Sequence, residues 1–299
     1  MRGLRMSVII PTCRGAGTLR QCVESVLADT PPSPEIILVD NGSDPATREV
    51  IRSLEPRVTT VVRLDRNLGY AGGNNAGVRR ATGEILFLLN DDARVLPGTL
   101  STTGGRMLQN PSIGIAGAKI YDPDGHTLQH AGAVLNRHAV SRHRGAGEED
   151  TGQYDVEKDV EFVTGTAWAV TRDLWDRLGG LSEVYFPGYY EETEFCWAAR
   201  RLGRRVVYLP GARVVHHGMR TTGRLSMRYH YYYHRHRLRY FLRTREKGQV
   251  GPFLRGELGW LLSLRNPEQF IPLLGAYLWN GLSLPATLSG RRELWRRLG

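Results

Sequence analysis

The sequence predicts an α/β fold: a mostly parallel central sheet flanked by helices, with a C-terminal helical extension. Four short apolar runs alternate with amphipathic stretches over the first 90 residues, and this rhythm is typical of a parallel sheet covered on both faces. The last quarter instead carries long stretches with helical periodicity. With 299 residues, 41% of them hydrophobic, the chain is long enough to bury one sizeable core plus an appended segment.

The first 92 residues follow a regular order. Apolar, β-branched runs predict strands, amphipathic spacing predicts helices, and Asn, Gly, Ser and Asp supply the turns between them. A Gly/Asn-rich loop at 67–75 leads into the last helix of this half. The expected strands are 7–11, 35–40, 58–64 and 84–89, and the expected helices are 18–27, 46–54 and a piece ending near 81.

After residue 92 the rhythm becomes irregular. The stretch 126–159 is rich in Gly, His and charge, and we expect a long, partly mobile insertion there. Two domains are predicted. The first covers residues 1–222 and has a nucleotide-binding half at about 6–92 and an acceptor half at about 93–222, and the second covers the basic C-terminal segment 223–299. The expected strands are 113–120, 160–170, 204–209 and 213–216, and the expected helices are 191–202, 229–245, 251–264 and 267–288, the last interrupted at Pro272 and Pro285.

Charge is concentrated at one end of the chain. The net charge is +10, yet residues 220–299 carry 15 Arg/Lys against four Glu, so the remaining residues sum to −1. Such a basic tail attracts nucleic acid, an anionic membrane or an acidic partner. Three widely spaced cysteines fit neither a disulfide framework nor a zinc site, so we expect a reducing, cytoplasmic setting, without a leader peptide or a spanning helix.

Polar residues follow three of the predicted strands directly. In an open α/β sheet such strand ends share one crevice, where carboxylates and amides can bind a ribose or a base; for any one cluster alone, ordinary turn chemistry is the alternative. The glycines after the first strand lack dinucleotide-fingerprint spacing, and no phosphate-binding Gly-Lys-Ser/Thr occurs, so side chains and a metal would have to hold a nucleotide. The clusters are 11–12, 40–43 and 90–92.

Two of these features can carry a metal. Asp91 and Asp92 end a buried strand and offer the hard oxygen ligands that suit Mg²⁺ or Mn²⁺, and His216 ends a later apolar segment. A mixed oxygen and nitrogen site favours Mn²⁺. The alternatives are a solvated turn for the acids and a satisfied core residue for the histidine.

Three carboxylates gather at the start of the predicted helix 191–202. Glu191 and Glu194 share one face, whereas Glu192 lies beside aromatic and apolar residues that can raise its pKa. A carboxylate with a raised pKa suits a general base that deprotonates a sugar hydroxyl. The alternative is that acidic residues merely favour the helix N-terminus, at about 0.3–1 kcal/mol each.

Taken in order, these motifs resemble those of family 2 glycosyltransferases, with the bacterial rhamnosyltransferase and galactofuranosyltransferase-like branch the most similar. The resemblance covers about residues 6–245. It rests on six segments: SVIIPT at 7–12, ILVDNGS at 37–43, NLGYAGGNNAG at 67–77, LLNDD at 88–92, YEETEF at 190–195 and VHH at 215–217.

The resemblance implies a GT-A fold that binds a nucleotide-sugar together with Mn²⁺ or Mg²⁺ and transfers the sugar with inversion. By position, Asp92 and His216 match the metal ligands and Glu192 the catalytic base. Asn90 replaces the first acid of the family's Asp-x-Asp motif, and Glu192 stands where Asp is more common. The residues expected to contact the nucleotide-sugar are Pro11, Thr12, Arg14, Asp40, Asn41, Ser43, Asn67, Gly69, Asn75, Asp91 and Asp92.

The acceptor side and the tail leave alternatives open. Residues flanking the base can form an aromatic acceptor platform or simply pack in the core: Gly165, Trp168, Tyr189, Tyr190 and Glu191. The Tyr/Arg-rich stretch 229–243, with Trp260, Trp279 and Trp295, can lie on the inner face of the cell membrane, cover the sheet or form a homodimer.

The resulting expectation is an inverting transferase that moves a sugar, rhamnose among the candidates, from a dTDP or UDP donor to a hydroxyl of a glycan or lipid-linked acceptor. No nucleic-acid partner is expected. Two rival hypotheses remain: a nucleic-acid-binding protein that uses the basic tail, and a catalytically inactive relative that only binds nucleotide-sugars. The first leaves the six motifs unexplained.

Overall fold

The computed structural model describes residues 5–29, 34–218, 226–246, 248–263 and 266–299. The chain forms two compact units. The first comprises Met1–Val134, His143–Pro187 and Glu191–Gly218, and the second comprises Leu135–Arg142, Gly188–Tyr190 and Met219–Gly299. The second unit thus takes in two short segments besides the tail. The predicted boundary at 222/223 falls outside the described residues and stays a prediction.

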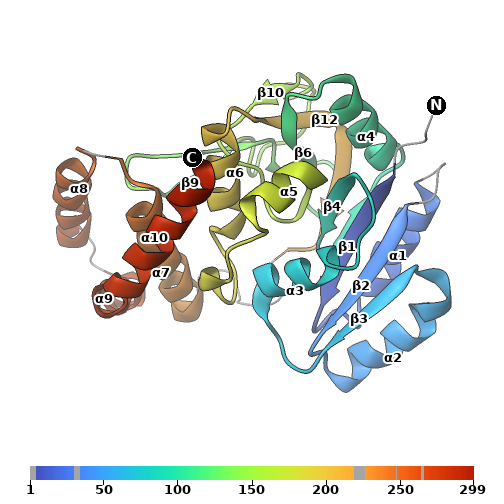
Figure 1. Ribbon diagram of the computed structural model, residues 1–299, viewed down its shortest axis with the longest axis horizontal. Helices are drawn as coiled ribbons and strands as arrows, with labels where there is room; N and C mark the ends of the chain where they lie inside the picture. Colours follow the sequence, from blue (N-terminus) through green and yellow to red (C-terminus); the bar gives the residue numbers. More distant parts are fainter. Residues whose placement is uncertain (1–4, 30–33, 219–225, 247, 264–265) are drawn as a thin grey trace. The chain divides into compact units, whose positions relative to one another are not determined.

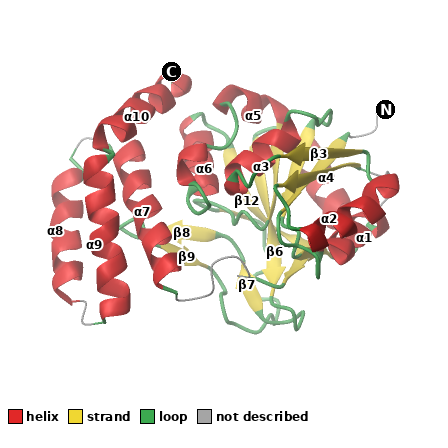
Figure 2. Ribbon diagram, turned by 90° about the horizontal axis from the view of Figure 1, so that it is seen from below, coloured by secondary structure: helices red, strands yellow, loops and turns green. Residues whose placement is uncertain are grey.

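A mixed sheet forms the centre of the first unit (Figures 1 and 2). Along its main path the strand order is β10-β12-β6-β11-β4-β1-β2-β3, with β5 paired to β12 and β7 to β6. Strands β1 to β4 are parallel to one another, as β12 is to β6, whereas β11 runs antiparallel to both of its neighbours, β4 and β6. The strands are β1 (Met6–Thr12), β2 (Glu35–Asn41), β3 (Thr60–Leu64), β4 (Ile85–Leu89), β5 (Ala93–Val95), β6 (Ile113–Tyr121), β7 (Leu128–His130), β10 (Lys158–Asp159), β11 (Ala167–Thr171) and β12 (Arg205–His216).

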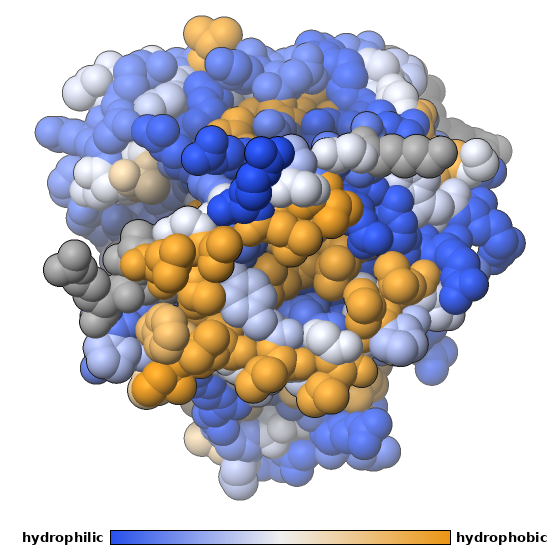
Figure 3. All heavy atoms as spheres, turned by 90° about the vertical axis from the view of Figure 1, so that its left-hand side faces the viewer, coloured by the Kyte–Doolittle hydropathy of each residue, from blue (hydrophilic) through white to orange (hydrophobic). Residues whose placement is uncertain are grey.

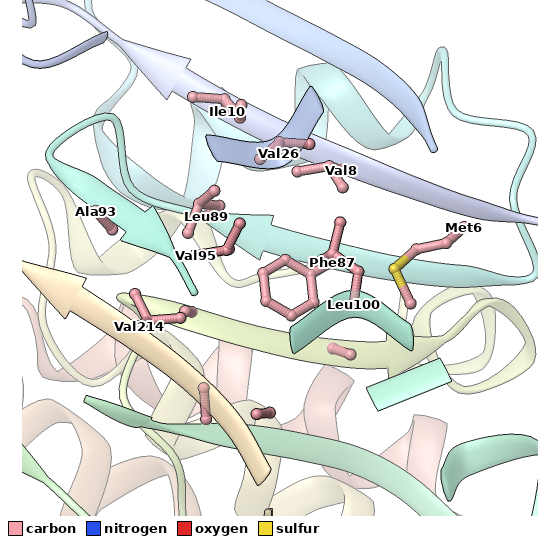
Figure 4. Packing of buried hydrophobic residues seen from close by; sticks show 14 of the residues in the cluster. Met6, Val8, Ile10, Val26, Phe87, Leu89, Ala93, Val95, Leu100 and Val214 are labelled. Atoms are coloured by element: carbon pink, nitrogen blue, oxygen red, sulfur yellow. The ribbon is translucent and has the colours of Figure 1, made fainter. Parts of the chain in front are cut away.

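Helices cover this sheet, and aliphatic side chains fill the space between. Val8, Phe87 and Val214 come from three different strands and meet Val26 and Leu100 from the helices in one buried cluster (Figure 4). Continuous burial along β1, β2 and β4 explains why these strands are uninterrupted apolar runs. The helices are α1 (Leu19–Ala28), α2 (Pro45–Leu54), α3 (Gly69–Val78), α4 (Thr99–Gln109), α5 (Arg172–Leu178) and α6 (Glu191–Arg201), with short 3₁₀ turns η1 (Glu55–Arg57) and η2 (Glu183–Tyr185).

Three expectations for the irregular half are corrected. The predicted strand 160–170 is interrupted by a turn at Gly165 and Thr166, so only its last part joins β11. The two predicted strands 204–209 and 213–216 are one strand, β12, with a register shift between Leu209 and Arg213. The stretch 126–159 contains β7, β10 and the two-stranded pair β8 (Ala133–Leu135) and β9 (Ser141–His143).

The second unit is helical, with α7 (Met227–Thr244), α8 (Val250–Ser263), α9 (Pro267–Leu282) and α10 (Leu284–Leu298) (Figure 2). The predicted helix 267–288 is two helices that meet at Ser283. Pro285 stands in the first turn of α10, where a missing N–H costs nothing, while Pro272 lies inside α9 without ending it.

Candidate functional site

The ends of β1 and β4 meet through a pair of side chains. The Thr12 hydroxyl donates a hydrogen bond to the Asp91 carboxylate. Burial raises the pKa of Asp91 to about 6, although the Thr12 hydrogen bond opposes the rise. A Cβ at Gly15 would lie 2.4 Å from Asp91 Oδ2 and 2.5 Å from Thr12 Oγ1, so this loop needs a glycine to approach the pair. Two of the three predicted strand-end clusters therefore share one edge of the sheet.

The residues after β2 join the same edge. Asp40 accepts a hydrogen bond from the Ser43 N–H at 2.8 Å, which closes the turn, and the Ser43 hydroxyl donates to the Thr12 carbonyl at 3.1 Å. Asp40, Asn41 and Ser43 are all buried. Pro11 is partly exposed and Arg14 is exposed. Hydrogen bonds from Thr47 lower the pKa of Asp44, and the charge of Arg14 adds a small further lowering.

Asn41 organises the loop that precedes α3. Its Nδ2 donates to the Gly69 carbonyl at 3.1 Å and to Asn67 Oδ1 at 3.2 Å, and its Oδ1 accepts from the Leu68 N–H at 2.8 Å. Gly69 has a φ of +74°, and a Cβ there would lie 2.7 Å from the Pro187 carbonyl oxygen. The Asn67 and Gly69 of the sequence motif thus shape a tight loop beside the strand ends.

Asn75 has a different position from the one expected. Its Nδ2 donates to the Leu181 carbonyl and to Glu183 Oε1, both at 2.9 Å, and its Oδ1 accepts from the Leu181 N–H at 2.9 Å. The Asn75 amide therefore bonds to the segment around η2, and none of its polar atoms is left for the expected nucleotide-sugar. Its role in this structure is to hold that segment against α3.

Asp92 and His216 lie side by side, as the metal hypothesis requires. Asp92 Oδ1 is 3.1 Å from His216 Nε2, and the Asp92 carbonyl accepts the His217 N–H at 3.0 Å. Pairing of β5 with the end of β12 produces this contact, because His216 is in register with Ala93. Both side chains are mostly buried.

Gln129 holds the His216 ring through a hydrogen bond to its Nδ1. Its Nε2 donates to Asp122 Oδ1 at 2.6 Å and to the His216 carbonyl at 2.8 Å, so its Oε1 faces His216 Nδ1 at 2.8 Å. With Gln129 Oε1 as the acceptor, Nδ1 donates this hydrogen bond, and Nε2 is the ring nitrogen that faces Asp92. Metal-binding histidines commonly donate their second ring N–H in this way.

The Asp92 and His216 pair fits a divalent cation. A carboxylate oxygen and a ring nitrogen this close to each other need a proton or a cation between them. Adjacent ligands of an octahedral ion at about 2.1 Å lie about 3 Å apart, which agrees with the observed 3.1 Å. Among the described residues no group of three or more His, Cys, Asp or Glu side chains could hold a metal, so water or ligand oxygens would have to complete the shell.

Glu192 stands in the first turn of α6. It keeps some exposure to solvent. Burial of its carboxyl raises the pKa to about 7, while hydrogen bonds from the backbone of Glu192, Thr193 and Gly165 oppose the rise. The helix N-terminus thus holds the carboxylate in place, and desolvation tunes its affinity for a proton toward neutral pH.

The turn at Gly165 and Thr166 connects the two parts of the site. The Gly165 backbone hydrogen-bonds to Glu192 on one side, and the Thr166 carbonyl accepts the Asn90 N–H at 2.9 Å on the other. Tyr70 supports this turn because its hydroxyl donates to the Gly165 carbonyl at 2.6 Å and accepts from Trp168 Nε1 at 3.0 Å. Glu192 and the strand end that carries Asp92 therefore contact the same short segment.

The other two acids of α6 are buried. Glu194 is buried and accepts a hydrogen bond from the Tyr185 hydroxyl at 2.6 Å. Glu191 is also buried. Phe195 packs on Trp168 and Trp175, with ring centroids 5.7 and 5.4 Å apart, and so seats α6 against β11 and α5. Glu192 is the most exposed of the three carboxylates.

Two of the expected acceptor residues are corrected. Trp168 is fully buried and Tyr190 is 3% exposed, so neither ring is available to a sugar, and the core-packing alternative holds for both. Tyr189 and Tyr190 belong to the second unit and have φ values of +80° and +75°, a strained backbone for non-glycine residues. Tyr190 is fixed there by its hydrogen bond to the Ala139 carbonyl at 2.6 Å.

Comparison with known proteins places this geometry in a family. The model of glycosyl transferase family 2 matches residues 7–179, which is more than half of the chain. This chain belongs to glycosyl transferase family 2. The match contains the strand-end clusters and Asp92, while Glu192 and His216 lie beyond it.

Two relatives illustrate the range of the family. "Uncharacterized protein y4gI" of Sinorhizobium fredii is 34% identical over 227 residues, or 73% of this chain and 25% of its own length. The N-acetylglucosaminyl-diphospho-decaprenol L-rhamnosyltransferase of Mycobacterium tuberculosis is 27% identical, over 77% of this chain and 81% of its own. The chain thus spans about a quarter of the first relative and most of the second.

A solved structure of GalNAc-T7 with UDP, GalNAc and Mn²⁺ superposes with a TM-score of 0.68 at 18% identity. The match covers 86% of this chain and 51% of that one. This likeness concerns the fold, and it confirms the expected GT-A fold of this family 2 member.

Sequence reasoning missed two residues that this family 2 site uses. The sequence pattern assigns no separate role to Tyr70, and an aromatic residue between the Asn-Leu-Gly turn and a glycine pair is the one signal that marks it. Gln129 lies in the stretch expected to be an insertion, 87 residues from His216, and no local pattern marks it.

Proposed function

We propose that the protein transfers a sugar from a nucleoside-diphosphate donor to an acceptor hydroxyl with inversion of the anomeric centre, and that Glu192 is the general base. One observation carries the proposal: a carboxyl with a pKa near 7, held by the backbone of Gly165 and the start of α6. A base works best when its pKa is close to the operating pH. Family membership supports the reaction class.

The donor would bind at the edge where β1, β2 and β4 end. Thr12, Asp40 and Asn41 form this edge, and the Asn67–Gly69 loop borders it. Asp92 and His216 would hold Mn²⁺ or Mg²⁺, and Gln129 would keep His216 Nε2 free for it. When bound, such a cation neutralises the charge that develops on the departing diphosphate.

Glu192 would take up the proton that the acceptor hydroxyl releases. The Glu192 carboxylate accepts the proton of the acceptor hydroxyl as that oxygen attacks the anomeric carbon. The bond to the diphosphate oxygen breaks on the opposite face, so one displacement inverts the configuration. The backbone hydrogen bonds from Gly165 and Thr193 keep the carboxylate oriented during this step.

The identities of sugar and acceptor rest on one relative. The name of the Mycobacterium tuberculosis protein specifies a rhamnosyl donor and a lipid-diphosphate acceptor. At 27% identity over most of both chains, it supports dTDP- or UDP-linked deoxyhexoses as the first donors to test and a lipid-linked glycan as the acceptor class. Such an acceptor would place the reaction at the inner face of the cell membrane.

Calorimetric titration with UDP and with dTDP, each with and without Mn²⁺, tests the donor site. We expect metal-dependent binding of one nucleotide, weakened by Asp92→Ala and by His216→Ala. The neighbouring His217 has an exposed side chain, so His217→Ala is the matched control and should bind as the wild type does. If neither nucleotide binds with any metal, the proposal is wrong.

A sugar-transfer assay tests the proposed role of Glu192 as the base. With the nucleotide that binds, Glu192→Gln should retain donor binding and lose transfer. If the wild type binds a donor but transfers no sugar, the protein is an inactive nucleotide-sugar-binding relative. A preference for nucleic acid over both nucleotides would favour the basic-tail hypothesis.

A further inference from the structure

Helix α8 has its polarity reversed for a protein surrounded by water. Its one acidic residue, Glu257, is 4% exposed and forms a two-pronged ion pair with the fully buried Arg237, at 2.6 and 2.8 Å. Leu254, Leu258 and Leu262, spaced four apart, form a stripe on this helix and are 59%, 58% and 78% exposed. A water-facing helix normally places these groups the other way round.

Helix α9 repeats the reversal. Leu278 and Leu282 are 70% and 86% exposed, and Ile271 and Leu274 continue the stripe. The inner face instead carries Asn280, whose Nδ2 donates to the Arg235 carbonyl at 3.0 Å. The sequence has no charged residue between Glu268 and Arg291, so α9 carries no charged side chain beyond its first turn.

The two stripes form an apolar face of the second unit. Helices α8 and α9 lie together because Tyr277 donates a hydrogen bond to Glu257 at 2.7 Å and Phe253 packs in one cluster with Ala276. Figure 3 views the side of Figure 1 on which α8 and α9 are labelled, and a broad apolar area faces the viewer there. Contiguous exposed apolar areas of this kind mark interaction surfaces. The face comprises Val250, Leu254, Leu258, Leu262, Ile271, Leu274, Leu278, Leu282 and Leu284.

Charge decides which occupant fits this apolar face. Residues 220–299 carry a net charge of +11, so a second copy would bring two strongly basic segments together. An anionic bilayer offers both a hydrocarbon layer for the leucines and phosphate groups for the arginines, such as the exposed Arg255 on α8. None of the described helices is long and apolar enough to cross a membrane.

We propose that α8 and α9 lie in the plane of an anionic membrane with this apolar face buried among the lipid chains. The proposal goes beyond sugar transfer and does not depend on it. It also relocates the contact expected from the sequence. The Tyr/Arg-rich helix α7 turns Arg237, Arg239 and Tyr240 inward.

The tryptophans expected at the membrane are likewise engaged inside the second unit. Trp279 lies 3.6 Å from the Arg235 guanidinium and 4.1 Å from that of Arg239, measured to the ring centroid. Trp260 lies 4.8 Å from the Arg237 guanidinium in the same measure. These rings therefore pack on guanidinium groups of α7, and the proposed membrane contact is made by the exposed leucines of α8 and α9.

Co-sedimentation of the full chain with vesicles tests the proposal. Vesicles of phosphatidylcholine alone are compared with vesicles containing one third phosphatidylglycerol. Since each basic residue near an anionic surface contributes about 1 kcal/mol, we expect partitioning at least about tenfold stronger with the anionic lipid. The triple variant Leu258→Gln/Leu262→Gln/Leu278→Gln should lower it by at least about tenfold again, because the buried apolar area sets the strength of such contacts.

The controls separate this surface from others. Leu108 and Val156 are exposed apolar residues of the first unit, so Leu108→Gln/Val156→Gln should bind vesicles as the wild type does. Glu192→Gln should also bind normally, which keeps membrane binding distinct from transfer. All substituted leucines are exposed, so thermal unfolding without vesicles should be unchanged.

Three results would overturn the proposal. The first is vesicle binding that is absent, or that is the same for the triple variant and the wild type. The second is a dimer in light scattering that the triple variant dissociates while no vesicle binding occurs, which would make the apolar face an interface between copies. The third is equal binding to neutral and anionic vesicles, because the proposal specifies an anionic membrane.

Discussion

Replacing Glu192 by glutamine should stabilise the fold at alkaline pH while it abolishes transfer. Burial raises the carboxyl pKa from 4.5 to about 7. Ionising this group costs the folded state about 1 kcal/mol at pH 5 and about 3 kcal/mol at pH 8, relative to the unfolded chain. Glutamine has the same shape without the charge, so the variant escapes this cost.

The sign follows from the direction of the pKa shift. Because the folded pKa lies above the unfolded value, the carboxyl favours folding fully below pH 4.5, and this contribution is lost as the pH rises through 7. Urea unfolding of wild type and Glu192→Gln at pH 5 and pH 8 measures it. The stability difference between the two proteins should widen by about 2 kcal/mol at the higher pH.

The same substitution should lower kcat between a hundredfold and ten-thousandfold, with little change in donor KM. In the wild type, kcat should fall as the pH drops below about 7, because the base becomes protonated. Glu149→Gln, which alters an exposed carboxylate, should change neither property. An equal stability difference at both pH values, or a variant with normal kcat, would refute the reasoning.

Three other substitutions probe the supports of the site. Gln129→Ala should weaken Mn²⁺ binding about 10–100-fold in electron paramagnetic resonance titrations without donor, since the His216 ring loses its partner; unchanged affinity would speak against a positioning role. Tyr70→Phe leaves buried partners unsatisfied, so urea unfolding should show a loss of about 1–3 kcal/mol, and a turnover drop at constant donor KM should accompany it. Gly69→Ala should destabilise by more than about 1 kcal/mol, because φ is +74° and the added methyl meets a carbonyl oxygen; a tolerated alanine would contradict this.

The parts of the site that sequence could locate depend on local pattern. Strands β1, β2 and β4 are continuous apolar runs, and parallel strands end at a common edge, so the polar residues after them had to converge. Thr12 and Asp91, 79 residues apart, meet for this reason. Glu192 could be assigned to the first turn of a helix because acidic residues stand at the start of a stretch with helical periodicity.

The remainder depends on tertiary contacts that leave no local trace. The run 160–170 has the composition of one strand, and only the packing of Tyr70 against Gly165 explains why it turns there. Gln129 reaches His216 through the pairing of β7 with β6. Trp168 has the composition expected of a sugar-stacking residue, yet the β11 register turns it into the core.

The turn at Gly165 and Thr166 limits how this enzyme could be redesigned. Its two contacts, to Glu192 and to Asn90, are made by main-chain atoms, which no side-chain substitution can replace. A graft that changes the length of this turn would displace Glu192 and the loop that carries Asp92 together. Acceptor preference is therefore better altered by exchanging side chains around the turn than by transplanting the loop itself.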